Sequence, residues 1–139
     1  MRLHTPLLAF ALMIVGTQGA IAHGDGAPQP VDTTGLKPLG EETVMTNPYR
    51  GDKLAIEIGA RGYNSNCARC HGLDVKSGGM APDLRALPPD DESDGWFLQR
   101  VLHGAVRDER VKMPPFDGLL SQEAIWAIRS YIDAQPDDQ

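Results

Sequence analysis

The sequence predicts an all-α fold, with about three main helices joined by long loops. Three segments place apolar residues at the three- and four-residue spacing of a helix. No segment alternates apolar and polar residues as a half-buried strand does. Glycine and proline gather between the helical segments, at 78–79, 82, 88–89 and 114–115, which favours loops there.

The three helices are expected over 52–63, over 96–103, and between Ser121 and Pro136. Gly104 is a stop signal for the second helix, and Ser121 has a side chain suited to an N-cap. The apolar stripes that predict these helices are Leu54 with Ile58, Ala55 with Gly59 and Tyr63, Phe97 with Val101, and Ile125 with Ile128 and Ile132.

Two long stretches between the helices are expected to be irregular. The first, 72–94, ends in acidic residues at 90, 91, 92 and 94. We interpret this cluster as a solvated turn that leads into a helix, because helix N-termini attract acidic side chains. The second irregular stretch is 106–119. The chain ahead of Tyr49 is rich in Gly, Pro, Thr and Asp without periodicity, which is typical of an extended arm.

The two cysteines of the chain lie in the run Cys67-Ala68-Arg69-Cys70-His71, which is the attachment signature of c-type haem. A thioredoxin-type redox pair is one alternative, but it belongs at a helix start in a β-α-β unit, which the flanks do not predict. A zinc site is another, but adjacent Cys70 and His71 converge poorly on one ion. The motif therefore predicts one haem c, bound covalently through Cys67 and Cys70, with His71 as a ligand of the iron.

A second ligand of the iron has several candidates in the chain. Met113 is favoured because it precedes two prolines in a loop between two helices, and prolines stiffen a ligand loop. The alternative for Met113 is a side chain that fills a gap in the core. An iron left without a second ligand would instead indicate a haem enzyme or a gas sensor. The candidates are Met45, Met80, Met113, His23 and His103.

The N-terminus has the three parts of an export signal. Arg2 precedes an apolar stretch over 7–15, and Ala20-Ile21-Ala22 is a small-x-small cleavage site. The stretch is too short to span a bilayer, so we expect cleavage rather than an uncleaved anchor, and a periplasmic protein. The expected organisation is a signal peptide over 1–22, an extended arm over 23–48 and a haem domain over 49–139.

The charge balance narrows the class of partner. The chain has 13 Lys and Arg against 19 Asp and Glu, a formal net charge of −6, and loss of Arg2 with the signal makes it −7. An acidic chain of this kind is unsuited to nucleic acid. It is attracted to a partner with a positive surface patch.

The motifs together resemble class I c-type cytochromes over residues 50–134. The resemblance rests on Gly59 and Tyr63 ahead of the Cys67 motif, on Ala81-Pro82-Asp83-Leu84, on Met113-Pro114, and on a last helix with Trp126 and Tyr131. It implies that the first and last helices cross, with Trp126 and Tyr131 against Gly59 and Tyr63. It also implies that the Pro82 carbonyl accepts a hydrogen bond from the second ring nitrogen of His71.

A finer resemblance, over 47–51, 62–73, 77–85 and 120–131, is to PedF-type cytochromes c, which serve PQQ-dependent (quinoprotein) alcohol dehydrogenases. It implies a monohaem electron carrier rather than an enzyme. Such a protein takes single electrons from the dehydrogenase and passes them to a terminal oxidase or another cytochrome. A monomer without a stable membrane anchor is expected, and a different periplasmic dehydrogenase remains an alternative donor.

Overall fold

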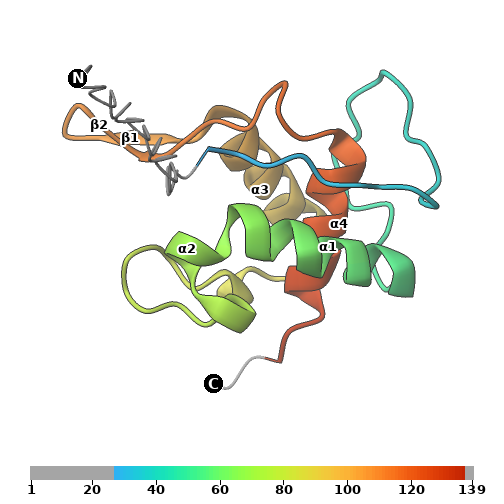
Figure 1. Cartoon of the computed structure of the whole chain (residues 1–139), viewed down its shortest axis with the longest axis horizontal. Helices are drawn as coiled ribbons and strands as arrows, with labels where there is room; N and C mark the ends of the chain where they lie inside the picture. The colour runs from blue at the N-terminus through green and yellow to red at the C-terminus, as the bar shows by residue number, and fades with distance from the viewer. Residues whose placement is uncertain (1–26, 137–139) are drawn as a thin grey trace, which may run out of the picture.

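The computed structural model describes residues 27–136, and in this range it is mostly helical, as the sequence predicts (Figure 1). The signal peptide prediction lies outside the described residues. None of the described helices is long and apolar enough to cross a membrane. The elements are α1 (Lys53–Asn66), α2 (Ala68–His71), α3 (Asp91–His103), β1 (Ala105–Arg107), β2 (Arg110–Met113) and α4 (Gln122–Asp133), with 3-10 turns at Leu73–Val75 and Leu84–Ala86.

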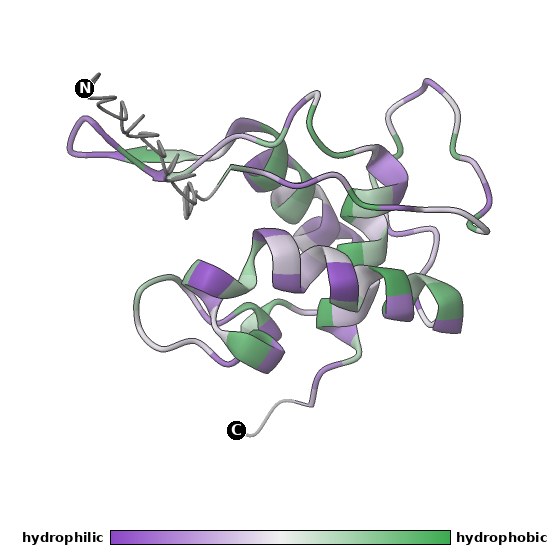
Figure 2. Ribbon diagram, in the orientation of Figure 1, coloured by the Kyte–Doolittle hydropathy of each residue, from purple (hydrophilic) through white to green (hydrophobic). Residues whose placement is uncertain are grey.

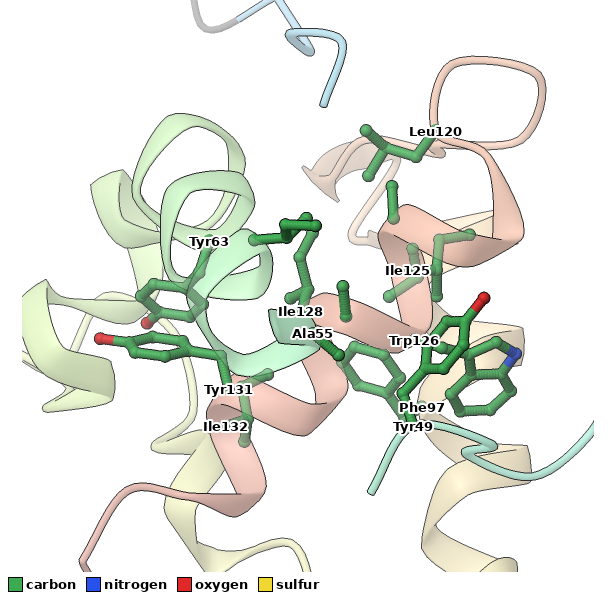
Figure 3. Close-up of a cluster of buried hydrophobic side chains, with 14 of the residues drawn as sticks. Tyr49, Ala55, Tyr63, Phe97, Leu120, Ile125, Trp126, Ile128, Tyr131 and Ile132 are labelled. Carbon is green, nitrogen blue, oxygen red and sulfur yellow. The ribbon is translucent and has the colours of Figure 1, made fainter. Parts of the chain in front are cut away.

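The core forms where α1 and α4 cross, and a glycine permits the close approach. A Cβ atom on Gly59 would lie 1.9 Å from the carbonyl oxygen of Ala127, so no larger residue fits there. The rings of Tyr63 and Tyr131 lie 5.4 Å apart at the same crossing. The predicted contact between Tyr63 and Tyr131 is confirmed. Figure 3 shows Trp126 at the other end of the apolar cluster from Tyr63, so the expectation for Trp126 is wrong.

Side-chain caps set where the helices begin. The carboxylate of Asp52 accepts a hydrogen bond from the Ala55 amide at 2.9 Å, and the Ser121 hydroxyl accepts one from the Ala124 amide at 3.2 Å. Asp90 caps α3, which therefore starts at residue 91 and not at residue 96 as predicted. The helix expected over 52–63 runs on to residue 66.

The stretch 106–119 was expected to be irregular, but it begins with a β-hairpin. Strands β1 and β2 are antiparallel, with Val106 opposite Val111 and Arg107 opposite Arg110. The hairpin projects from the end of α3 (Figure 1), and Figure 2 shows hydrophobic residues within it and a hydrophilic tip. The sequence lacks the usual hairpin signal, because its turn residues are not Asn-Gly or Asp-Gly.

The chain ahead of α1 lies along the helices, held by hydrogen bonds that reach far in sequence. The amide of Gln29 donates to the Asn66 side chain at 2.7 Å, and the Asn66 amide group donates back to the Gln29 carbonyl at 3.1 Å. The Leu39 amide donates to Glu123 of α4 at 2.9 Å. Leu36 of this segment is buried in the core. The described part of the arm is thus tied to both α1 and α4.

Asp94 corrects the expectation of a solvated acidic cluster. Its side chain is fully buried, 2.9 Å from Nε of Arg129, whose side chain is equally buried, and 2.7 Å from the Arg50 guanidinium. The Asn47 amide donates to the same carboxylate at 2.7 Å. Asp91 and its other neighbours in the cluster are exposed, as expected. Asp94 therefore ties α3 to α4 and to the segment that leads into α1.

Candidate haem site

A cavity of about 340 Å³ opens where α2, α3 and the end of the hairpin meet. Its walls are mainly apolar, and they include Leu84, Phe97, Val101 and Ile128. A volume of this size is within the usual range for a cofactor pocket. The predicted site residues Cys67, Cys70, His71, Pro82 and Met113 all border this one cavity.

The motif residues are placed by one short helical turn. Cys67 caps α2, and its carbonyl accepts hydrogen bonds from the amides of Cys70 at 3.1 Å and His71 at 2.9 Å. Both thiols are free of disulfide bonds. Burial raises the pKa of the Cys67 thiol to about 12, and the nearby Cys70 adds to the shift. The turn thus brings two thiols and one imidazole to the same wall of the cavity.

The ring of His71 is oriented by a backbone carbonyl. Its Nδ1 lies 2.8 Å from the carbonyl oxygen of Pro82. A carbonyl can only accept a hydrogen bond, so Nδ1 carries a proton, and in a neutral ring Nε2 then keeps its lone pair. A hydrogen bond of this kind fixes a metal-ligating ring and raises its basicity. The neutral His71 ring therefore has one nitrogen available as a metal ligand.

The loop that presents the Pro82 carbonyl is itself braced. The Ser77 hydroxyl donates to the Ala81 carbonyl, and the Ser77 amide lies 3.4 Å from the Asp83 carboxylate. The Arg85 guanidinium lies 2.8 Å from the same carboxylate. The hydrogen bond from Arg85 lowers the pKa of Asp83 to about 2, against an ordinary value of 3.8.

The Asp83 contact should make the fold sensitive to acid. The pKa of Asp83 is lower in the folded protein than in the unfolded chain, so the carboxylate stabilises the fold above about pH 4. This contribution is lost as the pH falls through about 2. We expect Asp83→Asn to lower the free energy of unfolding near neutral pH and to converge with the wild type in acid. Denaturant titrations at a series of pH values measure both curves, and a gap as large at about pH 2 as at neutral pH would contradict this account.

The candidates for the second iron ligand differ in whether they border the cavity and in how exposed they are. Met113 is partly buried and Met80 is 77% exposed, and both border the cavity. Met45 is exposed and does not border it. His103 lies at the end of α3, where its Nδ1 is 3.0 Å from the Gln99 carbonyl. His23 lies outside the described residues.

Met113 is held more firmly than Met80. It ends β2, and a Cβ atom on Gly104 would lie 2.3 Å from the Met113 carbonyl oxygen, so the backbones are in close contact there. Three residues further on, the Phe116 amide donates to the Val101 carbonyl at 2.9 Å. Met80 follows two glycines whose surroundings are open. The structure thus fixes the path of the chain on both sides of Met113.

Among the cavity-wall residues that the prediction of the site missed are Trp96, Arg100 and Lys112. The Arg100 guanidinium lies over the Trp96 ring, 5.2 Å from its centre. Trp96 and Arg100 are four residues apart on α3, so their spacing was a signal that they share a face. Arg100 and Lys112 are cations suited to the propionate groups of a haem.

These residues fit a covalent haem. Two adjacent thiols, one oriented imidazole, apolar walls and two cations are the groups that a c-type haem requires, and all border one cavity. Fold and site together define a c-type cytochrome.

A family model described as "Cytochrome C oxidase, cbb3-type, subunit III" matches residues 54–132, and the chain belongs to this family of cytochrome c domains. Cytochrome c550 of Pseudomonas aeruginosa is 59% identical over 119 residues, which are 83% of this chain and 82% of that protein. The protein is accordingly an electron carrier with one haem c, attached through Cys67 and Cys70.

Two further similarities are to parts of much larger proteins. Quinohemoprotein alcohol dehydrogenase ADH-IIG of Pseudomonas putida is 38% identical over 81 residues, which are 58% of this chain and 11% of that enzyme. The solved structure of ADH-IIG from the same species matches with a TM-score of 0.51 and 34% identity, over 70% of this chain and 14% of that one.

Proposed function

We propose that this protein is a periplasmic carrier that takes single electrons from a PQQ-dependent alcohol dehydrogenase and passes them to a terminal oxidase or another cytochrome. The observation that carries the proposal is the similarity to part of a quinohemoprotein alcohol dehydrogenase. In that enzyme dehydrogenase and haem share one protein. A chain that is mostly a cytochrome c domain suits the same transfer between separate proteins.

The chain would serve this role by holding and shielding the haem. His71, oriented by Pro82, and Met113 would be the two protein ligands of the iron. Bound haem iron supplies a one-electron change of oxidation state, and a methionine ligand raises its reduction potential. The apolar walls exclude water, and the stiff chain on both sides of Met113 limits rearrangement. With His71 and Met113 both bound to the iron, no ligand position would be open to a substrate, as suits a protein that only carries electrons.

The proposed role also includes export and cleavage. The signal peptide over 1–22 would be removed, leaving the arm over 23–48 and the haem domain over 49–139. The N-terminal residue of the purified protein tests this, because cleavage as proposed leaves His23 first. A retained Met1 would contradict the organisation without affecting the haem site.

The identity of the second axial ligand has an optical test. The oxidised protein should show the weak far-red band of a sulfur-to-iron bond, and Met113→Ala should abolish it. Met80→Ala is the matched control, because Met80 borders the same cavity but is exposed, and it should retain the band. Loss of the band in Met80→Ala alone would reassign the ligand. A wild type without a sulfur ligand would favour a haem enzyme or sensor.

The proposed donor is tested with purified proteins and with cells. A quinoprotein alcohol dehydrogenase supplied with ethanol should reduce the oxidised cytochrome rapidly, and more slowly at high ionic strength because charge steers the encounter. Deletion of the gene should impair growth on ethanol and spare growth on an organic acid. Normal growth on ethanol, in a strain without a substitute cytochrome, would contradict this donor.

A further inference from the structure

The segment that follows His71 has an unusual backbone. Gly72 has a φ of 88°, and a Cβ atom there would lie 1.8 Å from the Lys76 carbonyl oxygen, so no larger residue fits. Asp74 and Val75 then have φ of 54° and 63°, although neither is a glycine. A positive φ is a genuine outlier for a β-branched residue such as Val75. Strain of this kind persists only where the surrounding structure holds it, and it is concentrated at functional sites.

This strained turn, residues 72–76, is held from outside. The Gly72 amide donates to the Ala68 carbonyl at 2.9 Å, where α2 ends, and the Gly72 carbonyl accepts a hydrogen bond from the Tyr63 hydroxyl at 2.8 Å. Both polar groups of this glycine are therefore fixed. Val75, further along the turn, is fully buried. Because Tyr63 belongs to α1, its hydrogen bond ties the turn to one of the two helices that form the core.

The hydroxyl of Tyr63 is not needed where α1 and α4 cross. The rings of Tyr63 and Tyr131 make the contact there, and the Tyr131 hydroxyl has no hydrogen bond to any residue within 27–136. The two hydroxyls lie on the same side of the apolar cluster (Figure 3). Tyr63 is fully buried, and a buried tyrosine hydroxyl usually has a hydrogen-bond partner. Its partner here is the carbonyl of Gly72, so the hydroxyl acts on the turn and not on the crossing.

The turn 72–76 is the first part of the loop that joins His71 to Pro82. The second part of this loop is braced by the side-chain contacts described above, which fix the Pro82 carbonyl. The position of the His71 ring relative to that carbonyl then depends on the first part, because Gly72 follows His71 directly. A shift of Gly72 would therefore change the 2.8 Å contact between Nδ1 of His71 and the Pro82 oxygen.

We propose that the Tyr63 hydroxyl is a positioning group for His71. By holding the strained turn, it aligns the His71 ring with the Pro82 carbonyl. The inference rests on the proposed ligation of the iron by His71. A strong hydrogen bond from Nδ1 raises the basicity of the ring, and a more basic ligand favours the oxidised state of the iron. Tyr63 thus lowers the reduction potential of the bound haem, and it acts through Gly72 and His71.

The three tyrosines of the chain give a matched set of variants. Tyr63→Phe removes the hydrogen bond to Gly72 but keeps the ring at the helix crossing. Tyr49→Phe removes a hydrogen bond of the same kind, from a buried tyrosine to the Lys37 carbonyl, and neither of these residues borders the cavity. Tyr131→Phe removes a hydroxyl without such a bond. Tyr63→Phe and Tyr49→Phe should therefore lower the free energy of unfolding by similar amounts, and Tyr131→Phe by less.

Of the three variants, only Tyr63→Phe should change the properties of the haem-loaded site. Redox titration should show a reduction potential higher by about 20–40 mV, which corresponds to a roughly twofold to fivefold change in the equilibrium constant for reduction. In the reduced protein, the proton on Nδ1 of His71 should exchange with solvent severalfold faster, as measured by NMR, because its hydrogen bond is weaker. Tyr49→Phe and Tyr131→Phe should leave the potential and the exchange rate unchanged.

A potential that moves equally in Tyr63→Phe and Tyr49→Phe, or in neither, would overturn the inference, because the Tyr63 hydroxyl would then be merely structural. If Tyr63→Phe loads too little haem, 3-fluorotyrosine gives the comparison. In a Tyr49→Phe, Tyr131→Phe background Tyr63 is the remaining tyrosine. Fluorination makes its hydroxyl a better donor, which should lower the potential. An unchanged or higher potential there would also overturn the inference.

The proposed function fails by different observations. In the wild type, the NMR signals of the His71 ring should shift strongly when the iron is oxidised, and signals that stay in place would contradict His71 as a ligand. Neither the potential nor the exchange rate involves a dehydrogenase, so a different electron donor would leave the role of Tyr63 intact.

Discussion

A Cys67→Ala, Cys70→Ala variant should lose all covalent haem. Both thiols lie on one helical turn at the wall of the cavity, and the chain has no other cysteine to replace them. Covalent haem also adds apolar surface to the core, so the variant should be poorly folded when purified. Haem staining after electrophoresis under denaturing conditions measures the covalent bond directly.

The control for the cysteine variant is Met113→Ala. This change removes an axial ligand but neither thioether, so the denatured protein should keep its stain. Haem that remained bound to the denatured double cysteine variant would contradict attachment at Cys67 and Cys70. A weaker haem stain in both variants would instead indicate a general failure of haem loading. A wild-type sample prepared in parallel reveals such a failure.

Asp94→Ala should lower the free energy of unfolding by about 3–5 kcal/mol, because it removes one partner of a buried ion pair. The fully buried Arg129 guanidinium would keep Asp133 at 3.2 Å as an ionic partner but lose the carboxylate at 2.9 Å, and the Arg50 guanidinium would lose a contact at 2.7 Å. The Asn47 amide would lose its acceptor as well. Denaturant unfolding of the haem-loaded protein, followed by circular dichroism, measures the difference.

Two comparisons separate this effect from a change at the start of a helix. Asp91→Ala removes an exposed carboxylate from the first turn of the same helix and should cost about 0.5 kcal/mol. An Asp94→Leu, Arg129→Met double variant should recover much of the loss, since a buried pair replaced by apolar side chains is often neutral. An Asp94→Ala variant as stable as Asp91→Ala would show that Arg129 is satisfied without Asp94.

The parts of the fold that could be predicted from sequence are those fixed by neighbours along the chain. The Ser121 cap and the Gly104 stop depend on residues within one turn, and both are in place. The burial of Asp94 could not be predicted, because its partner Arg129 is 35 residues away. The β-hairpin was missed for a different reason, since its Asp108-Glu109 turn carries no glycine or asparagine to mark the positive φ angles.

The same distinction applies to the site: residues close together in sequence could be predicted, and residues brought there by the fold could not. The Cys67–His71 motif is contiguous, so its chemistry could be predicted from spacing alone. The pairing of His71 with Pro82 came from a family resemblance, and the 2.8 Å contact has no signature in the ten residues between them. Nothing in the sequence places Lys112 at the cavity, because it lies there as part of the hairpin, which the sequence did not predict.

The crossing of α1 and α4 has a consequence for the order in which the chain can fold during synthesis. Helix α1 buries its glycine face against a helix that begins some 60 residues later, and the arm ahead of α1 bonds to that same helix. Until α4 has left the ribosome, α1 lacks the helix that it crosses, and the arm lacks its contacts with α4, although it can bond to α1. The cysteine pair, which lies between α1 and α4 in the chain, therefore stays accessible at least until α4 has been made.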